Sequence, residues 1–304
     1  MSSQKLIAGQ AGISYGGFLF GQSVRFAFNL LVARLLGHEA LGVYALAFGM
    51  MQIAETIGVG GYDAAVVRYM NLYPKEHRMA SEASGFAIRS AVLASLVPLL
   101  FVTLFSAPIT RLLHGGELLR YALLSYAMAV PFNVVTVVAG HAIQAHRDLV
   151  PKIVATQILS PLAMLVLLLL VLASGSGPGP ALLIPYTAAS VISCLWIGRQ
   201  LDLKTGTGFR EVLHAPADSR MRSFAFALLG VSLLSMLSYW LDILLLGVLG
   251  GPALSGLYQP AARTAGLLRA VLPAFAGIVA PIVAAFQADR KSTRLNSSHL
   301  AESR

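Results

Sequence analysis

Eight long apolar stretches constrain the fold of this chain more than any other feature of its sequence. Each is long enough to cross about 30 Å of hydrocarbon as a helix, which takes about 20 residues. A bilayer leaves no water for unpaired backbone groups, and the alternating pattern of a membrane barrel is missing from the sequence. The sequence therefore predicts an all-α, polytopic membrane bundle. Its expected spans are 11–36, 41–61, 85–105, 118–145, 153–173, 181–199, 223–249 and 256–286.

Prolines interrupt several of these spans. A proline removes one backbone N–H and so frees a carbonyl in the preceding turn. In a membrane this is tolerated where a neighbouring helix supplies a replacement donor. We expect such replacements at Pro98, Pro131, Pro161, Pro185, Pro273 and Pro281.

The composition excludes several classes of protein. Only 12% of the residues are charged and 57% are hydrophobic, whereas a soluble domain has about 25% charged residues. The chain is therefore no ordinary soluble enzyme, disordered protein or nucleic-acid binder. A single cysteine, Cys194, allows neither an internal disulfide nor a cysteine-based zinc site. The histidines have no metal-ligand spacing, so we expect them to be solvated, and we expect no cofactor.

The loop charges predict the orientation. With the N-terminus in the cytoplasm, eleven Lys and Arg residues fall inside and three outside, which is a clear positive-inside bias. This bias accounts for much of the net charge of +9. Segments 63–84 and 200–222 are expected to be polar cytoplasmic connections. The inside residues are Lys5, Arg68, Lys75, Arg78, Arg147, Lys152, Arg199, Lys204, Arg210, Arg220 and Arg222, and the outside ones are Arg34, Arg111 and Arg120.

An internal repeat divides the chain. The segment NLLVARLLG at 29–37 precedes Gly42-Val-Tyr44, and DILLLGVLG at 242–250 precedes Gly256-Leu-Tyr258, at an offset of 213 and then 214. Six spans separate the copies, so both begin in the cytoplasm and form a parallel repeat. We predict a first transmembrane half at 1–222, with six spans and a cytoplasmic loop. The start of a second half, with two spans, is expected at 223–289.

The last fifteen residues differ from the rest. Segment 290–304, RKSTRLNSSHLAESR, has no apolar periodicity and resembles a translated cloning or adaptor sequence. We expect this tail to be non-native, and the natural protein to continue beyond about residue 289.

Several segments carry a family resemblance: Gln22, Arg25 and Asn29 with ARLLG at 33–37, GVYALA at 42–47, VVRY at 66–69, and LGGPALSGLYQPAAR at 249–263. They resemble bacterial polysaccharide-biosynthesis flippases of the multidrug/oligosaccharidyl-lipid/polysaccharide exporter superfamily, which includes O-antigen translocases. The resemblance spans residues 6–286. It implies a transporter of 12–14 helices in the bacterial inner membrane, of which about eight are present. Such proteins carry polyprenyl-diphosphate-linked saccharides from the cytoplasmic to the outer leaflet by alternating access.

Polar residues inside the spans are the candidates for a substrate cavity, because ionisable groups in a membrane are costly. Gln22, Arg25 and Asn29 lie within about 60° of one another on a helix. We call these three residues the first stripe. The repeat maps them onto Ser235, Ser238 and Asp242, which we call the second stripe. Together with polar positions of spans two and eight, the two stripes predict one shared cavity. Its remaining members are Glu55, Arg263 and Arg269.

The roles of the acidic residues stay open. Asp242 and Arg263 are expected at similar depth, either as a buried structural pair or as substrate contacts. Glu55 either is a protonated helix residue or couples an ion. Arginine matches phosphate oxygens in a bidentate fashion, so Arg25 and Arg269 suit a lipid diphosphate.

Three functions agree with the sequence. The first is the flippase, with membrane lipids and a lipid-linked saccharide as partners. The second is a multidrug or cation antiporter of the same superfamily, which would favour intramembrane acids over arginines. The third is a membrane glycan polymerase or ligase, which would need a large outer loop. The sequence has no GxSxG, HExxH or ATP-binding motif, so we expect no enzyme. An ion gradient, the membrane potential or mass action would supply the energy.

Overall fold

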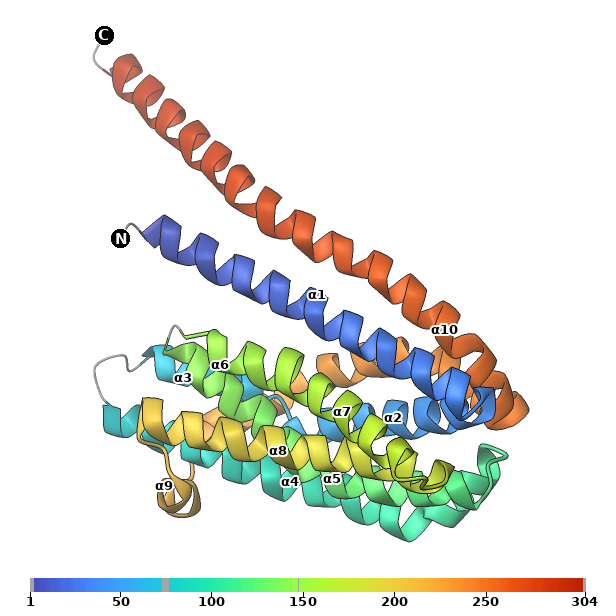
Figure 1. The fold of residues 1–304 in the computed structure, drawn as a ribbon. Helices are drawn as coiled ribbons and strands as arrows, with labels where there is room; N and C mark the ends of the chain where they lie inside the picture. The colour runs from blue at the N-terminus through green and yellow to red at the C-terminus, as the bar shows by residue number, and fades with distance from the viewer. Residues whose placement is uncertain (1–2, 73–76, 147, 303–304) are drawn as a thin grey trace. The chain divides into compact units, whose positions relative to one another are not determined.

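The computed structural model describes the backbone of residues 3–72, 77–146 and 148–302, and the side chains of 12–71, 79–146, 148–262 and 264–265 (Figure 1). Two units are present: Gly12–Pro260, and Met1–Ala11 together with Ala261–Arg304. All contacts discussed below belong to Gly12–Pro260.

The described residues form helices and short connections, with no β-strand, which confirms the predicted all-α class. Three helices are short: α6, α9 and the π-helix η1, which sits between α6 and α7. The elements are α1 (Ser3–Leu35), α2 (His38–Val59), α3 (Tyr62–Leu72), α4 (His77–Leu112), α5 (Glu117–Ala145), α6 (Val150–Ile153), η1 (Val154–Leu159), α7 (Ser160–Ala173), α8 (Pro178–Thr205), α9 (Phe209–His214) and α10 (Ser219–Glu302).

Six helical segments of the described chain are long and apolar enough to cross a membrane. Each contains one of the predicted spans two to seven. The first predicted span forms α1 but is less apolar than these six, because the first stripe interrupts it. The side chains of most of the eighth span lie outside the described residues. The six segments are His38–Asn71, Met79–Leu112, Glu117–Ala145, Val150–Ala173, Pro178–Thr205 and Ser219–Ala262.

The two expected cytoplasmic connections are more helical than a polar loop. Residues 63–84 contain most of α3 and the start of α4, and residues 200–222 contain α9. The chain bends between α2 and α3 at Gly60 and Gly61, whose φ values of 58° and 79° suit glycine. Polar composition alone does not reveal these helices, because α3 and α9 pack against α4.

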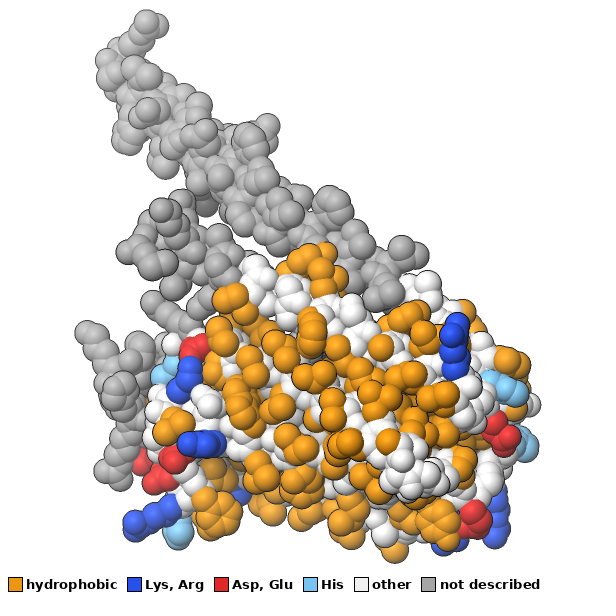
Figure 2. All heavy atoms as spheres, viewed as in Figure 1, with side chains coloured by type: hydrophobic (Ala, Val, Ile, Leu, Met, Phe, Trp, Pro, Cys, Tyr) orange, Lys and Arg blue, Asp and Glu red, His pale blue; other side chains and the backbone are white. Residues whose placement is uncertain are grey.

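The surface shows how the bundle meets a membrane. In Figure 2, hydrophobic side chains cover the middle of the visible face, and charged side chains gather toward its two ends. Large apolar side chains such as Leu104, Leu195 and Phe226 are at least two-thirds exposed. In a soluble protein so much exposed apolar surface would promote aggregation. Here it fits the acyl chains of a bilayer, so the chain is a multi-pass membrane protein.

Helix α5 forms the centre of the bundle and packs against α2, α3, α4 and α8. Tyr126 of α5 is fully buried and donates a hydrogen bond to the Leu182 carbonyl, 2.9 Å away, on α8. Around it lies an aromatic cluster contributed by five helices. Its rings are in sequential contact, and its members are Phe28, Tyr44, Phe48, Tyr126, Tyr186 and Trp240.

The backbone repeats an unusual conformation at the two copies of the sequence repeat. Gly37 has φ 91° and ψ 169°, and Gly251, which lies 214 residues later, has φ 70° and ψ −165°. Each comes directly before a helical segment. Beyond Gly251 the chain folds back, since Ser255 donates a hydrogen bond of 3.2 Å to the carbonyl of Ile243. A straight helix would separate these two residues by about 18 Å.

The two copies also touch each other through equivalent residues. A Cβ added to Gly42 would overlap the Pro252 carbonyl oxygen, and one added to Gly256 would overlap the His38 carbonyl oxygen. Both the glycines and the residues they meet are related by the offset of 214. Reciprocal contacts of this kind are the mark of a two-fold axis. The structure thus shows a two-fold relation between the two copies, and their parallel orientation in the membrane stays a prediction.

Trp240 anchors the first part of α10 to the bundle. It is 2% exposed, stacks edge-on against Phe48 and covers Gly49. We expect Trp240→Ala to destabilise the folded protein by about 3 kcal/mol, because the lost ring leaves a cavity. Thermal unfolding in detergent measures this. Its neighbour Tyr239 is 47% exposed, so Tyr239→Ala is the matched control. Equal losses for both variants would contradict the anchoring role.

Candidate membrane cavity

The first stripe lies on α1, with Gln22 and Arg25 half-buried and Asn29 buried. The Arg25 guanidinium donates two hydrogen bonds to η1. Nη1 reaches Oε1 of Gln157 at 3.0 Å, and Nη2 reaches the Thr156 carbonyl at 2.8 Å. A Cβ on Gly21, one turn earlier, would press against the Gln157 carbonyl. Glycine therefore lets α1 approach η1 closely enough for Arg25 to bind it.

Pro161 explains why the Thr156 carbonyl is available. In η1 the Ser160 N–H donates to the Ala155 carbonyl, five residues back. The same register would pair the Thr156 carbonyl with residue 161, but proline has no N–H. Arg25 supplies the missing donor. This is the replacement predicted for an interrupted span, and it fixes the direction of the guanidinium.

Asn29 connects α1 to the second copy of the repeat. Its Nδ2 donates to the Arg25 carbonyl at 2.7 Å, and its Oδ1 accepts a 3.4 Å hydrogen bond from Nε2 of Gln259. Gln259 is fully buried and was not among the predicted site residues. Its position in the LGGPALSGLYQPAAR segment was the only available signal.

The second stripe faces a different environment. Ser235, Ser238 and Asp242 are exposed on the part of α10 whose Trp240 is buried. Ser235 donates to its own helix, at the Val231 carbonyl, and Asp242 accepts a 3.4 Å hydrogen bond from the Tyr258 hydroxyl. The described contacts join the two stripes only indirectly, through the segment that carries Tyr258 and Gln259.

Glu55 belongs to the interior of the bundle rather than to either stripe. It is half-buried on α2 and accepts a 3.5 Å hydrogen bond from Gln52. Its carboxyl acts electrostatically on Tyr186. The Tyr186 hydroxyl in turn accepts a 2.8 Å hydrogen bond from Asn133. The side chains of Arg263 and Arg269 lie outside the described residues, so the pairing of Asp242 with Arg263 stays a prediction.

A second polar group was missed by the sequence analysis. Lys152 of α6 lies 2.9 Å from Nε2 of His141 and donates a 2.7 Å hydrogen bond to Gln144, both on α5. His141 is half-buried, so the expectation of a solvated histidine was wrong at this position. The reason is tertiary: α6 returns directly over α5 after a short connection.

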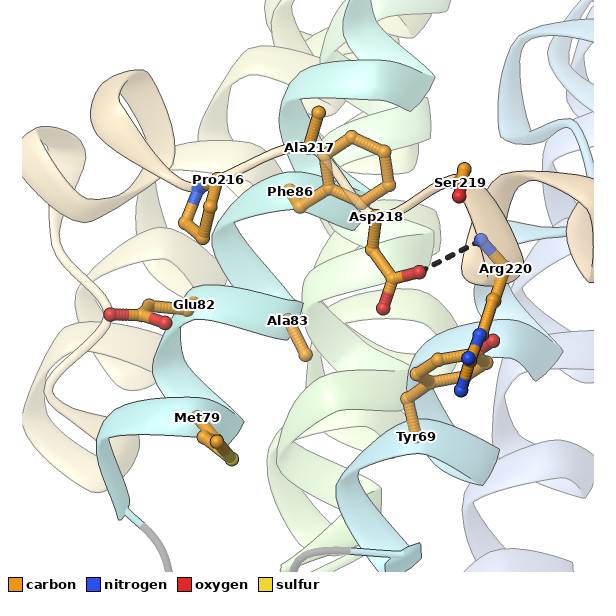
Figure 3. A pocket seen from close by; sticks show the side chains of 10 residues that line it. All are labelled: Tyr69, Met79, Glu82, Ala83, Phe86, Pro216, Ala217, Asp218, Ser219 and Arg220. Carbon is orange, nitrogen blue, oxygen red and sulfur yellow. Dashed lines mark hydrogen bonds between the residues drawn. The ribbon is translucent and has the colours of Figure 1, made fainter.

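A pocket of about 400 Å³ lies at the predicted cytoplasmic side, between α3, α4 and the start of α10 (Figure 3). Glu82, Asp218 and Arg220 bring charges of both signs to its wall, and Tyr69 and Phe86 add aromatic rings. Asp218 accepts the backbone N–H of Arg220 at 2.9 Å and so caps α10. None of the seven predicted cavity residues whose side chains the structure describes lines this pocket. Among the described residues there is also no cluster of metal ligands.

Comparison with known proteins defines the family. One similar solved structure is a multidrug resistance MATE family transporter of the MOP superfamily in an inward-facing conformation. Its sequence is 18% identical to this chain and its TM-score is 0.60. The match covers 88% of this chain and 59% of the transporter chain. A second solved chain, named protein A, is 15% identical with a TM-score of 0.68, and the match covers 93% of this chain and 65% of protein A. The present chain thus spans about six-tenths of each. No curated protein matches it.

Because their sequence identity to this chain is low, these two structures show only that the fold is shared. A family model described as polysaccharide biosynthesis protein matches residues 10–287, which is most of the sequence. The match includes both copies of the repeat, the first stripe and the π-helix that binds it. The chain therefore belongs to the polysaccharide biosynthesis protein family.

Proposed function

We propose that this protein is a flippase that moves a lipid-diphosphate-linked oligosaccharide from the inner to the outer leaflet of a bacterial cytoplasmic membrane, by alternating access, for cell-surface polysaccharide synthesis. The observation that carries the proposal is the guanidinium of Arg25, which lies on the predicted first span and donates hydrogen bonds to Gln157 and Thr156.

The geometry of Arg25 suits a diphosphate. A permanent cation in a span is costly and is kept where it has a function or a partner. The amide of Gln157 and the carbonyl of Thr156 are neutral, so they orient the guanidinium without removing its charge. Both contacts come from one short segment, η1, which positions the fork as a unit. A positioned fork of this kind can bind phosphate oxygens through two parallel hydrogen bonds.

The comparisons support the class of cargo and of mechanism. The family description names polysaccharide biosynthesis, and the fold is shared with a transporter of the MOP superfamily. Reciprocal contact between the two repeat copies at Gly42 and Gly256 supplies an axis about which two halves could move. Both features favour transport over catalysis.

Glu55 favours a second candidate, a cation antiporter of the same superfamily. A half-buried carboxyl within a span can exchange a proton or bind a cation, and the solved MATE structure is of a multidrug resistance transporter. Glu55 has amide and phenol neighbours in Gln52 and Tyr186, which agree equally with a protonated structural acid.

Proteoliposomes distinguish these functions. We expect the purified protein to carry a fluorescent polyprenyl-diphosphate saccharide between leaflets, measured by quenching with a membrane-impermeant reductant, and to leave ethidium untransported. The glycan should be recovered with unchanged length. Ethidium transport that stops in Glu55→Gln, without movement of the lipid, would establish the antiporter instead. A lengthened glycan would establish a polymerase.

A further inference from the structure

A half-buried basic cluster lies at the predicted cytoplasmic end of α5, where α6 crosses it. It consists of His141, Gln144 and Lys152. Lys152 contacts both of the others, at 2.9 Å and 2.7 Å. Its aliphatic stem packs on Gly140, where a Cβ would come within 3.1 Å of the lysine Cγ. The missing side chain of Gly140 therefore gives the lysine stem its place on α5.

The contact between Lys152 and His141 restricts the number of protons that the pair can hold. Nδ1 of His141 lies 2.9 Å from the Val137 carbonyl oxygen, which can only accept, so Nδ1 carries a hydrogen. Nε2 of a neutral ring then offers a lone pair to the lysine ammonium. With a further proton on Nε2, two donors would face each other at 2.9 Å. The observed contact is therefore incompatible with both groups being fully protonated.

The surrounding charges make the pair sensitive to that proton. Asp63, at the start of α3, acts electrostatically on both His141 and Lys152. The nearby chain also holds the ion pair of Asp148 with Lys204 of α8, and the exposed His146. One carboxylate, Asp63, balances one positive charge of the pair. A second positive charge leaves the cluster with an excess, and repulsion then acts along the Lys152–His141 direction.

Lys152 is one helical turn from the residues that hold Arg25. The Thr156 hydroxyl donates to the Lys152 carbonyl at 2.8 Å, and the Thr156 carbonyl accepts from Arg25. Lys152 is therefore linked through its backbone to the start of η1, which is a π-helix. These contacts connect the basic cluster to α1.

We propose that the Lys152–His141 pair is a proton-binding site, and that uptake of a second proton from the cytoplasmic side separates the two side chains and shifts η1 relative to α1, which changes the hold on Arg25. The proton goes to Nε2 of His141, and the hydrogen bond from Lys152 to that nitrogen is lost. This inference goes beyond the proposed function, because it concerns local geometry and holds for any cargo.

Distance measurement between spin labels tests the proposal directly. Labels at Ser23 of α1 and Leu162 of α7, both exposed, are placed in the Cys194→Ser protein in nanodiscs. Distances are measured between about pH 8 and about pH 4.5, an interval that extends below the ordinary range of histidine because burial and Lys152 both disfavour the added proton. We expect two distance populations that exchange with pH. Nitrogen NMR of labelled histidine should show His141 gaining its proton over the same interval.

Three variants are expected to change the label distance in three different ways. His141→Gln offers an amide oxygen to Lys152 but takes no proton, so the distance should stay at its high-pH value. Lys152→Met keeps an unbranched stem over Gly140 and loses the donors, so the distance should stay at its low-pH value. His146→Gln is the matched control. His146 makes a similar backbone contact, 3.2 Å to Ala142, and this variant should keep the wild-type response.

Several outcomes would overturn the proposal. A pH-dependent distance that persists in His141→Gln would place the sensor elsewhere. A His141 ring that gains its proton with no change of distance would separate the site from α1. A ring that takes no proton over this range would remove the site itself. None of these readouts depends on transport, so failure of the flippase proposal is recognised separately.

Discussion

Arg25→Ala abolishes glycan export while the amount of folded protein stays near that of the wild type. This is the largest functional effect that we expect from one substitution. The guanidinium is the charged member of the first stripe, and its hydrogen bonds to Gln157 and Thr156 hold it in one orientation. The proposal assigns its remaining N–H donors to the phosphate oxygens. Alanine removes both the charge and the fork. Surface glycan in cells lacking the native flippase measures export, and size-exclusion chromatography measures the folded protein.

Two further variants show whether export depends on the charge of Arg25 or on the geometry of its guanidinium. Arg25→Lys should restore export only in part, because lysine keeps the charge but loses the bidentate fork. Arg34→Ala is the matched control on the same helix, since Arg34 is exposed near the outer end of α1, and it should export normally. If Arg25→Ala and Arg269→Ala both export at the wild-type rate, the diphosphate proposal fails. Loss of folded protein in Arg25→Ala would instead assign Arg25 a structural role.

Gly42→Ala and Gly256→Ala each remove most of the folded protein. At both positions a Cβ would overlap a backbone carbonyl oxygen of the other repeat copy, Pro252 and His38 respectively. Backbone atoms cannot move aside as a flexible side chain can, so α2 and the second part of α10 must separate. In an exposed helix interior the same change would stabilise the protein by about 1 kcal/mol. The expected sign is therefore the reverse of helix propensity.

Gly230→Ala is the control for this pair. Gly230 also lies in α10, but a Cβ there would meet nothing within 4 Å. Its yield in fluorescence-detected size-exclusion chromatography should equal or exceed that of the wild type. Wild-type yield from Gly42→Ala would show that the two repeat copies do not touch in the membrane, and the reciprocal contact would then have to be abandoned.

Much of the architecture follows from the sequence alone, because membrane insertion depends on properties that each segment carries by itself. Length and hydropathy predicted the six candidate spans among the described residues. The offset of 213 to 214 predicted the repeat, and Gly37 and Gly251 share their backbone conformation. Spacing on a helix placed Arg25 and Asn29 on one face, where both contact other helices.

Only the tertiary structure decided which groups meet. The sequence showed that Pro161 frees a carbonyl, but only the packing of α1 against η1 brings Arg25 to Thr156. His141 lies in α5 and Lys152 in α6, and their contact depends on α6 turning back over α5. A polar residue's helical face is periodic and readable from spacing. Its partner depends on how each helix rotates and packs, and that is settled by all the interhelical contacts together.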